Sequence, residues 1–263
     1  MDLQLSSKTA LVTGSTAGIG NAIATSLARE GATVIVNGRS AKAVTAAVDE
    51  MKTATKGKVL GFAGDLSDAA AAAELFAKHP AVDILVNNLG IFEVRSFEDI
   101  SDEDWRRFFE VNVLSGARLS RLYLPGMRKR NWGRIIFISS ESGLQIPVEM
   151  IHYGMTKAAQ IAVARGLAEL TAGTGVTVNS VLPGPTRSRG VGDFVVAMAE
   201  KSGKSAQTVE SEFFKTARPT SLLKRFATPE EVAAMVTYVA SPVSAATNGA
   251  ALRVDGGVVK SAF

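Results

Sequence analysis

The sequence predicts an α/β fold: one Rossmann-type, doubly wound parallel sheet of about seven strands with helices on both faces. Short apolar runs alternate with helical stretches along the whole chain, a pattern typical of right-handed crossovers between parallel strands. A glycine-rich turn, residues 13–20, joins the first apolar run to the first helix. The 263 residues are 46% hydrophobic, which supplies a large core. No repeat or linker interrupts the pattern, so we expect a single domain over residues 1–263.

The first half of the chain alternates regularly between the two kinds of element. Its helices are predicted from apolar residues at steps of four, such as Ile19, Ile23 and Leu27, and its strands from continuous β-branched runs. After a first strand that ends at 11–13, the expected elements are helix 18–30, strand 33–36, helix 42–55, strand 59–62, helix 68–78 and strand 84–86.

The second half continues the alternation but contains one long excursion. Ser101-Asp102-Glu103-Asp104 offers an N-cap and early acidic residues for a long helix. The next expected elements are strand 134–138, helix 153–171, strand 176–181, a helix that opens at Pro229, and strand 251–254. Residues 183–226 are too many for an ordinary connection, so we predict a helical substrate lid there, the lid segment. Its residues Phe194, Val195, Val196 and Met198 would line an apolar pocket, pack in the core or form an oligomer contact.

Composition excludes several classes of function. The chain has no Cys and only two His, so thiolate chemistry and a conventional metal site are not expected. The net charge of +4 is too small to indicate a nucleic-acid partner. No signal peptide and no apolar stretch of ~20 residues is present, so we expect a cytoplasmic protein without a membrane partner. We interpret the basic residues 128–130 with Arg134 as cations at a helix C-terminus.

The glycine-rich turn, Thr13-Gly14-Ser15-Thr16-Ala17-Gly18-Ile19-Gly20, favours a dinucleotide site. Glycines let the backbone approach a pyrophosphate, and the helix that follows offers N–H donors and positive potential. The turn after the second strand, Asn37-Gly38-Arg39-Ser40, lacks the acid that would bind a ribose 2′-hydroxyl and instead offers Arg39 for a phosphate. We therefore expect NADP(H) in preference to NAD(H).

Two further patterns indicate proton-transfer chemistry. Tyr153 and Lys157 stand four apart on a predicted helix, so they share one face, and a nearby ammonium would lower the pKa of the phenol from about 10. Ser139 and Ser140 end the fifth strand, at the edge where ligands bind in such sheets. Because neighbouring strand residues face opposite ways, we expect only one of the two hydroxyls to point at the site.

Together these motifs resemble the short-chain dehydrogenase/reductase family, in its compact subgroup of about 250 residues, which includes 3-oxoacyl-[acyl-carrier-protein] reductase-like members. The resemblance covers nearly the whole chain. It implies an enzyme that interconverts a carbonyl and a secondary alcohol by hydride transfer, with Tyr153 as the acid/base. By the family's spacing, Ser140 rather than Ser139 would orient the carbonyl. Lys157 would hold the nicotinamide ribose, and Asn112 would anchor a water that relays protons to Lys157.

The resemblance also implies the cofactor contacts. Asp65 resembles the acid at the adenine, Asn87-Asn88-Leu89-Gly90 the element after the fourth strand, and Pro183-Gly184-Pro185-Thr186 the segment beside the carboxamide. Asp255-Gly256-Gly257 matches a terminal element that we interpret as structural. The full expected set of cofactor contacts is Gly14, Ser15, Thr16, Gly18, Ile19, Gly20, Arg39, Asp65, Leu66, Asn88, Gly90, Tyr153, Lys157, Pro183, Gly184 and Thr186.

Several residues depart from the pattern or leave alternatives open. Leu89 is bulkier than the family's alanine, and Ala17 is not the cation that many NADP-using relatives carry. Glu141 either faces away along the strand or sits at the pocket mouth, and we expect His152 to face solvent. The alternative function is a non-catalytic, dinucleotide-binding redox sensor on the same fold. A sugar epimerase or dehydratase would need a larger C-terminal domain.

The substrate is expected to be a small carbonyl or alcohol. Basic residues of the lid segment would steer an anionic substrate or simply be solvated; these are Arg187, Arg189, Lys201, Lys204, Lys215 and Arg218. The small residues of the Tyr153 helix, with Ala158, Ala162 and Ala164 beside Gly166, would allow another helix to approach closely. The family resemblance implies a homotetramer or homodimer.

Overall fold

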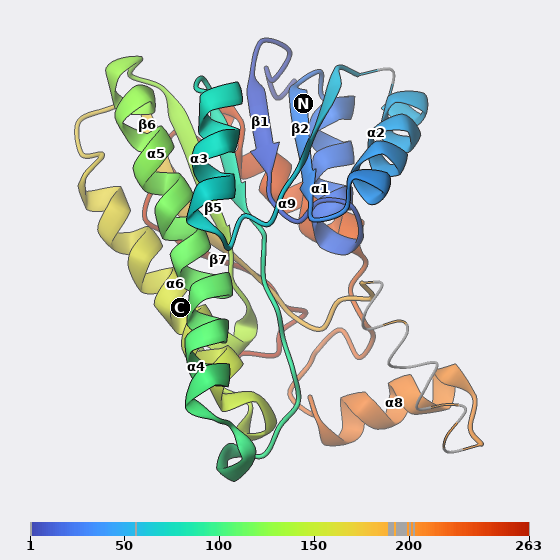
Figure 1. Cartoon of the computed structure of the whole chain (residues 1–263). Helices are drawn as coiled ribbons and strands as arrows, with labels where there is room; N and C mark the ends of the chain where they lie inside the picture. The colour runs from blue at the N-terminus through green and yellow to red at the C-terminus, as the bar shows by residue number, and fades with distance from the viewer. Residues whose placement is uncertain are drawn as a thin grey trace.

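A computed structural model describes residues 2–55, 57–188, 192, 199, 201 and 203–262. Its sheet has seven parallel strands in the order β3-β2-β1-β4-β5-β6-β7 (Figure 1). The strands are β1 (Thr9–Val12), β2 (Thr33–Gly38), β3 (Val59–Ala63), β4 (Ile84–Asn87), β5 (Gly133–Ile138), β6 (Val176–Pro183) and β7 (Ala251–Val254). The strand order reverses between β1 and β4, which is where a doubly wound sheet binds its ligand. The predicted fold class is confirmed.

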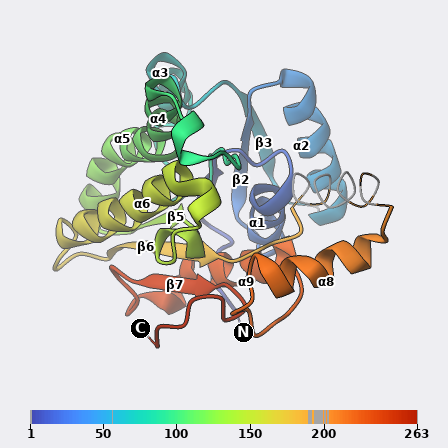
Figure 2. The ribbon, with the colours of Figure 1, turned by 90° about the horizontal axis from the view of Figure 1, so that it is seen from below.

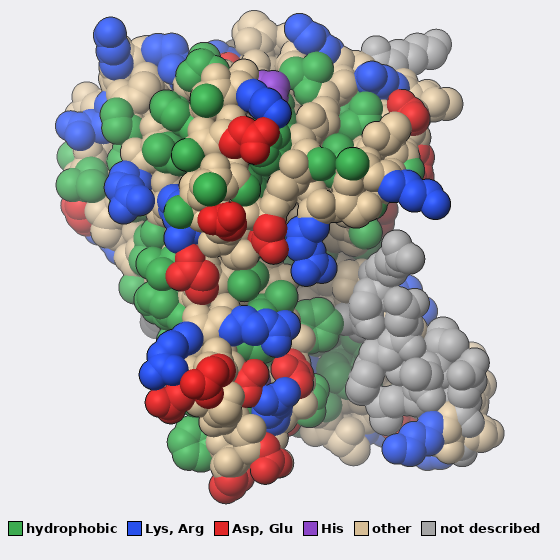
Figure 3. Space-filling model, in the orientation of Figure 1, with side chains coloured by type: hydrophobic (Ala, Val, Ile, Leu, Met, Phe, Trp, Pro, Cys, Tyr) green, Lys and Arg blue, Asp and Glu red, His purple; other side chains and the backbone are tan. Residues whose placement is uncertain are grey.

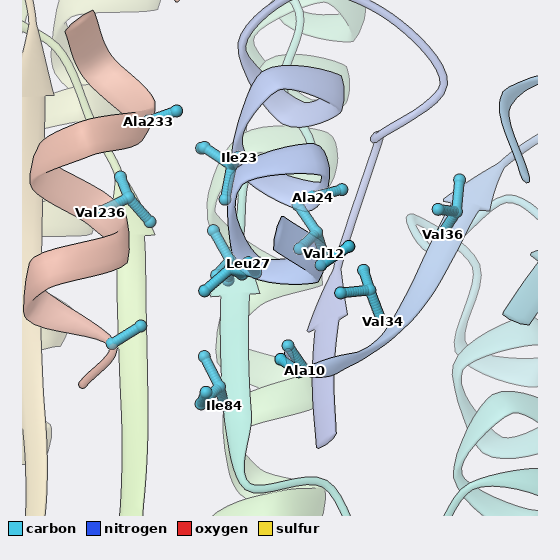
Figure 4. Packing of buried hydrophobic residues seen from close by; sticks show 14 of the residues in the cluster. Ala10, Val12, Ile23, Ala24, Leu27, Val34, Val36, Ile84, Ala233 and Val236 are labelled. Carbon is cyan, nitrogen blue, oxygen red and sulfur yellow. The ribbon is translucent and has the colours of Figure 1, made fainter. Parts of the chain in front are cut away.

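Helices cover both faces of the sheet, and each face has its own core. The helices are α1 (Gly18–Arg29), α2 (Ala41–Thr55), α3 (Ala69–Lys78), α4 (Asp102–Phe109), α5 (Ser115–Lys129), α6 (Ile151–Glu169), α8 (Ala206–Thr216) and α9 (Pro229–Val239). On one face α1 and α9 pack next to each other on the sheet, and Ile23 and Leu27 of α1 share a buried cluster with Val236 and Ile84 (Figure 4). On the other face α3, α5 and α6 bury a second cluster that includes Leu75.

The strand side chains divide between these cores as alternation requires. Val34 and Val36 belong to the first cluster, whereas Ile35 belongs to the second. All three are fully buried, which explains why the strands read as unbroken apolar runs instead of alternating ones.

The predicted long helix after Ser101 forms, but it changes pitch at one point. Ser101 and Asp104 make a capping box at the start of α4. Between α4 and α5 the chain adopts one π-helical turn, η2 (Glu110–Leu114). Such turns rearrange the backbone hydrogen bonds locally and frequently occur at functional sites. This one carries the buried Asn112.

The lid segment contains a helix, as expected, and it lies at the end of the molecule to which the strands point. Figure 2 views the protein from that end. Val209 and Phe214 of α8 pack with Phe226 in a small cluster of their own. The apolar residues Phe194, Val195, Val196 and Met198, as well as Arg189, lie outside the described residues.

The interpretation of Arg134 as a cation at a helix C-terminus is wrong. Arg134 is only 1% exposed at the start of β5, where its guanidinium donates to the carbonyls of Ser241 at 3.1 Å and Gly175 at 3.0 Å. It also lies over the Trp132 ring, and burial lowers its pKa to about 10. A strand that is covered on both faces buries whatever it carries, and three fixed carbonyl acceptors here replace water.

On the face shown in Figure 3, acidic and basic side chains intermingle over the region of α4. Salt bridges between near neighbours, such as Arg106 with Asp102 and Glu103, account for part of this mixture. Within the described ranges, no helix is long and apolar enough to span a bilayer.

Candidate active site

Most of the predicted site residues meet at the carboxyl edge of the sheet. The glycine-rich turn follows β1, Asn88 to Gly90 follow β4, Ser140 follows β5, and Thr186 follows β6. Helix α6 crosses this edge and brings Lys157 to the end of β5, where its Nζ donates to the carbonyl of Ile138 at 2.9 Å. A Cβ on Gly90 would lie 3.5 Å from Lys157 Nζ and 3.4 Å from Asn112 Oδ1, so this glycine gives the ammonium space.

The glycine-rich turn has the shape that a pyrophosphate needs. Gly14 and Gly18 both have φ of 59°, which favours glycine. A Cβ on Gly20 would come within 2.5 Å of both Asn88 Nδ2 and the Gly14 carbonyl. The N-cap of α1, Ala17, offers no side-chain hydrogen bond, so the first N–H groups of the helix remain available to an anion. The turn therefore fits the phosphates of a dinucleotide.

Polar side chains hold the glycine-rich turn in place through hydrogen bonds to the backbone. Ser15 is buried; its hydroxyl donates to the Val12 carbonyl at 2.6 Å and accepts from Asn37 N at 3.0 Å. Asn88 Nδ2 donates to the carbonyls of Thr13 at 2.8 Å and Gly14 at 3.0 Å. The polar groups of Ser15 and Asn88 are thus engaged with protein, so a cofactor would meet mainly their backbone.

The residues expected at the adenine lie at the ends of β2 and β3. Thr16 stands against Gly38, whose Cβ would be 2.5 Å from the Thr16 methyl group. Arg39 is exposed beyond this point. The Ser67 hydroxyl, 2.6 Å from Asp65, lowers the pKa of Asp65, and the charge of Arg39 contributes to the same shift. Arg39 and Asp65 are therefore close enough to serve one site.

Two other predicted cofactor contacts are partly or fully in the core. Leu66 is 1% exposed and packs in the second core cluster. Ile19 is half-buried and packs against the first cluster. A bound cofactor would touch Leu66 through its backbone.

The segment beside the proposed nicotinamide position is held from both ends. Thr186 is buried, its hydroxyl donates to the Gly184 carbonyl at 2.9 Å, and it pairs with Ala227 in an isolated β-bridge. Gly184 follows Pro183 and lies so close to the Asp255 backbone that a Cβ would be 2.6 Å from the Asp255 carbonyl oxygen. Asp255 thus fixes this segment by close packing, in agreement with its structural interpretation.

The side chains of the two serines after β5 point in different directions, as strand alternation predicts. Ser139 donates to the Lys157 carbonyl at 2.8 Å and is committed to holding α6. Ser140 faces the hydroxyl of Tyr153, as the effect of its hydrogen bond on the pKa of that tyrosine shows. Tyr153 is half-buried, with Phe92 edge-on at 6.4 Å and Lys157 Nζ 5.5 Å from its ring centre.

The expectation that Lys157 lowers the pKa of Tyr153 is wrong for this structure. Burial raises the pKa of Tyr153, and the Glu141 carboxylate adds to the increase; the Ser140 hydrogen bond and the Arg218 charge oppose it without outweighing it. Burial also lowers the pKa of Lys157 itself, to about 7. Lys157 is only partly charged at neutral pH and gives the phenolate little support.

Asn112 is joined to Lys157 through a residue that the sequence analysis missed. Asn112 is fully buried, and its side chain makes paired hydrogen bonds with the backbone of Ile91, at 2.8 and 2.9 Å. Its carbonyl accepts from Gln160 Nε2 at 2.6 Å, and Gln160 Oε1 accepts from Lys157 Nζ at 3.1 Å. Gln160 therefore links the π-helical turn directly to the ammonium. The available signal was its position, one turn beyond Lys157 on the same face of the helix.

Glu141 lies beside Ser140 and Tyr153, which settles its open orientation. Glu141 is 5% exposed and accepts from the Ser140 hydroxyl at 2.5 Å. Arg218, from the lid segment, donates to Glu141 at 3.1 Å and to Glu149 at 3.1 Å. We call Glu141, Glu149 and Arg218 the carboxylate cluster. No sequence pattern indicates this pairing, since Arg218 lies 77 residues from Glu141.

His152 does not face solvent as expected. It is fully buried, 4.0 Å from the Phe108 ring centre and edge-on to Trp105 at 6.1 Å. Neither ring nitrogen has a hydrogen-bond partner, and burial lowers the pKa of His152. The face of α6 that carries His152 packs on α4, which sequence alone does not reveal.

Three of the six basic residues named for the lid segment form salt bridges within the described residues. Arg187 forms a salt bridge with Glu210, Lys204 with Glu212, and Arg218 with both carboxylates of the cluster. The charges of these three residues are neutralised locally, which weakens the support for steering of an anionic substrate. In the described part of the chain, His, Asp and Glu side chains form no group of three that could hold a metal ion.

Comparison with known proteins places these features in context. Residues 8–198 match the family model for short chain dehydrogenases. The chain is 51% identical over 264 residues to an uncharacterized oxidoreductase of Bacillus subtilis, covering all of both chains. It is 36% identical to D-beta-hydroxybutyrate dehydrogenase of Cupriavidus necator, with 97% of this chain and 99% of that one covered.

A solved structure extends the similarity to the whole fold. L-sorbose reductase of Gluconobacter frateurii, complexed with NADPH and L-sorbose, superposes with a TM-score of 0.93 at 30% identity, covering 99% of this chain and 100% of that one.

Proposed function

The chain belongs to the short-chain dehydrogenase family, and on that premise we propose that it is an NADP(H)-dependent oxidoreductase that interconverts a carbonyl and a secondary alcohol with Tyr153 as acid/base. One observation carries the proposal: Ser140, Tyr153 and Lys157 lie together at the carboxyl edge of the sheet, beside a glycine turn shaped for phosphates. The named relatives are dehydrogenases and reductases, which supports the reaction class.

The residues suggest a simple division of labour. Bound NADPH would supply the hydride that reaches the carbonyl carbon, leaving NADP⁺. Ser140 would donate a hydrogen bond to the carbonyl oxygen, and Tyr153 would give that oxygen its phenolic proton. Because burial raises the pKa of Tyr153, the phenol is protonated at neutral pH, as a proton donor must be. Lys157 would contact the ribose, held in place by the Ile138 carbonyl and by Gln160.

The preference for NADP(H) rests on the turn after β2. Arg39 is exposed there, and no acid stands between Asn37 and Ser40 to bind a 2′-hydroxyl or repel a 2′-phosphate. The L-sorbose reductase neighbour was solved with NADPH, which is consistent with the same choice. The phosphates would lie on the glycine turn, at the N-terminus of α1.

A homotetramer or homodimer remains part of the proposal. A hollow of about 710 Å³ lies between α5 and α6, and its apolar lining includes Leu124, Val163, Leu167 and Leu170. Nothing lies within 4 Å of a Cβ built on Gly166, so this side of α6 is open to close approach. Sedimentation velocity should give a mass that is two or four times 27.6 kDa; a monomer at micromolar concentration would contradict this.

The test of the acid/base assignment removes the phenolic oxygen of Tyr153. Tyr153→Phe should lower kcat for NADPH-dependent carbonyl reduction by at least about 100-fold, since general acid catalysis contributes that much or more, and should leave NADPH binding intact. Tyr238→Phe, at an exposed tyrosine of α9, makes the same chemical change elsewhere and should leave kcat unchanged. If Tyr153→Phe kept its rate, the acid/base assignment would be refuted. Tight dinucleotide binding without turnover of any carbonyl would favour the redox sensor.

A further inference from the structure

The carboxylate of Glu141 is built into the position next to the reacting oxygen. Its Oε2 accepts from the Ser140 hydroxyl at 2.5 Å and from Ser142 N at 2.9 Å, and its Oε1 accepts from Arg218 Nε at 3.1 Å. It raises the pKa of Tyr153, so its charge acts at the phenol. Glu141 therefore borders the space in which Ser140 and Tyr153 would hold a carbonyl oxygen.

The Ser140 hydroxyl has one proton, for which two acceptors compete: the Glu141 carboxylate and the substrate carbonyl. In the structure that proton is donated to Glu141, whereas the proposed reaction requires it at the substrate carbonyl. When Ser140 turns to the substrate, Glu141 Oε2 keeps the Ser142 N–H but loses one of its two donors inside the protein, and the loss of a hydrogen bond destabilises a buried carboxylate. A substrate with a hydroxyl group on the carbon next to its carbonyl would bring the missing donor to this oxygen.

The charge around Glu141 favours the same kind of substrate. The carboxylate cluster contains two carboxylates, Glu141 and Glu149, against one guanidinium, Arg218. Its net charge is therefore negative, and neither Arg187 nor Lys204 reverses this, because each is paired with its own glutamate. An anionic group beside the carbonyl would be repelled, whereas a neutral hydroxyl donor would be accepted.

We propose that Glu141 is a specificity-determining residue that selects neutral substrates with a hydroxyl group adjacent to the reacting carbon: α-hydroxy carbonyls in reduction and vicinal diols in oxidation. This inference rests on the proposed function, because it concerns the substrate of the same Ser140–Tyr153 site. In each turnover the Ser140 hydroxyl moves its hydrogen bond from Glu141 to the carbonyl oxygen, and the substrate hydroxyl takes its place on Glu141. No covalent bond to Glu141 forms or breaks.

The test compares ketones that differ in one hydroxyl group. Butanone and 3-hydroxybutan-2-one form one pair, acetone and hydroxyacetone a second, and acetoacetate supplies an anionic ketone. Hydrogen bonds to charged groups contribute about 1.5–3 kcal/mol, so wild-type kcat/KM with NADPH should favour each hydroxy ketone by about 10- to 100-fold. Acetoacetate should be the poorest substrate.

Variants assign the preference to Glu141. Glu141→Gln keeps the shape and removes the charge, and it should reduce the hydroxy-ketone preference to below about 10-fold while improving turnover of acetoacetate. Glu212→Gln makes the same change at an exposed glutamate of the lid segment and should leave every ratio unchanged. Glu141→Gln leaves the buried Arg218 with Glu149 as its carboxylate partner. The double variant Glu141→Gln with Arg218→Leu removes the charges of both Glu141 and Arg218, so it controls for misfolding caused by an unbalanced buried guanidinium.

The outcomes separate this inference from the proposed function. If wild type reduced both members of each pair equally, or if Glu141→Gln kept the full preference, the role of Glu141 would be overturned while carbonyl reduction by Tyr153 stood. If no ketone of either kind were reduced, the proposed function itself would fall, and the inference with it. The wild-type ratios need no variant, so the inference can be refuted even if every variant unfolds.

Discussion

Replacing Gln160 by leucine should change the proton chemistry of the site without touching the cofactor or the substrate. Gln160 is 1% exposed, donates to the Asn112 carbonyl at 2.6 Å and accepts from Lys157 Nζ at 3.1 Å. Only one orientation of its amide makes both contacts, because the flipped amide would oppose oxygen to oxygen and nitrogen to ammonium. Leucine has a similar size but no polar atom, so Gln160→Leu removes both contacts at once.

The size of the effect follows from the loss of one acceptor on a buried cation. A hydrogen bond to a charged group contributes about 1.5–3 kcal/mol, which corresponds to about 1–2 pH units. Burial has already lowered the pKa of Lys157 to about 7, and the Ile138 carbonyl remains its partner in the variant. Gln160→Leu should therefore lower the pKa of Lys157 further, and the charged form should persist only at more acidic pH.

The assay is the pH dependence of kcat/KM for NADPH, measured from about pH 5 to 10. If the ammonium form of Lys157 holds the ribose, the basic limb of the profile should move toward acid in Gln160→Leu. It should move toward base in Gln160→Glu, where a carboxylate replaces the amide oxygen and favours the ammonium. Gln207→Leu, at an exposed glutamine of α8, should leave the profile unchanged.

The reasoning would be refuted by a particular combination of results. A purely structural role for Gln160 predicts that both variants lose stability and keep the same pH profile. Melting temperatures measured alongside the kinetics separate the two cases. A shift of the basic limb of the pH profile in the same direction in Gln160→Leu and Gln160→Glu would also contradict this role of Gln160.

Two other predictions concern the cofactor site and the stability of the protein. Arg39→Ala should weaken NADPH binding by about 10- to 100-fold, the contribution of a charge-assisted hydrogen bond, and leave NADH binding nearly unchanged; fluorescence titration with both nucleotides checks this, and equal losses would remove Arg39 from the phosphate site. Because the pKa of Lys157 falls from 10.5 in the unfolded chain to about 7 in the fold, the unfolded state binds more protons between these values, so stability should rise as pH increases from about 7 toward 10. Lys157→Met should flatten this rise in urea denaturation curves, and an equal slope in both proteins would contradict the burial of a titrating lysine.

Local sequence pattern was enough to predict the helices, the strands and the glycine turn. The strands and helices follow from apolar periodicity, and most described elements agree with the expected ranges to within one or two residues, as with strand β7 at Ala251–Val254. The glycine turn was predictable because a positive φ and close backbone approach demand glycine. Tyr153 and Lys157 were predictable as a pair because four residues make one turn of helix.

Tertiary structure alone decided which groups surround those local motifs. Gln160 reaches Asn112 across 48 residues, and Arg218 reaches Glu141 across 77. The burial of Arg134 and His152 and the weak support of Lys157 for the Tyr153 phenolate have the same origin. Local spacing fixes the face on which a side chain lies, but the segment that covers that face comes from elsewhere in the chain. Burial and charge pairing, which set each pKa and the selectivity of the site, therefore exist only once those segments pack together.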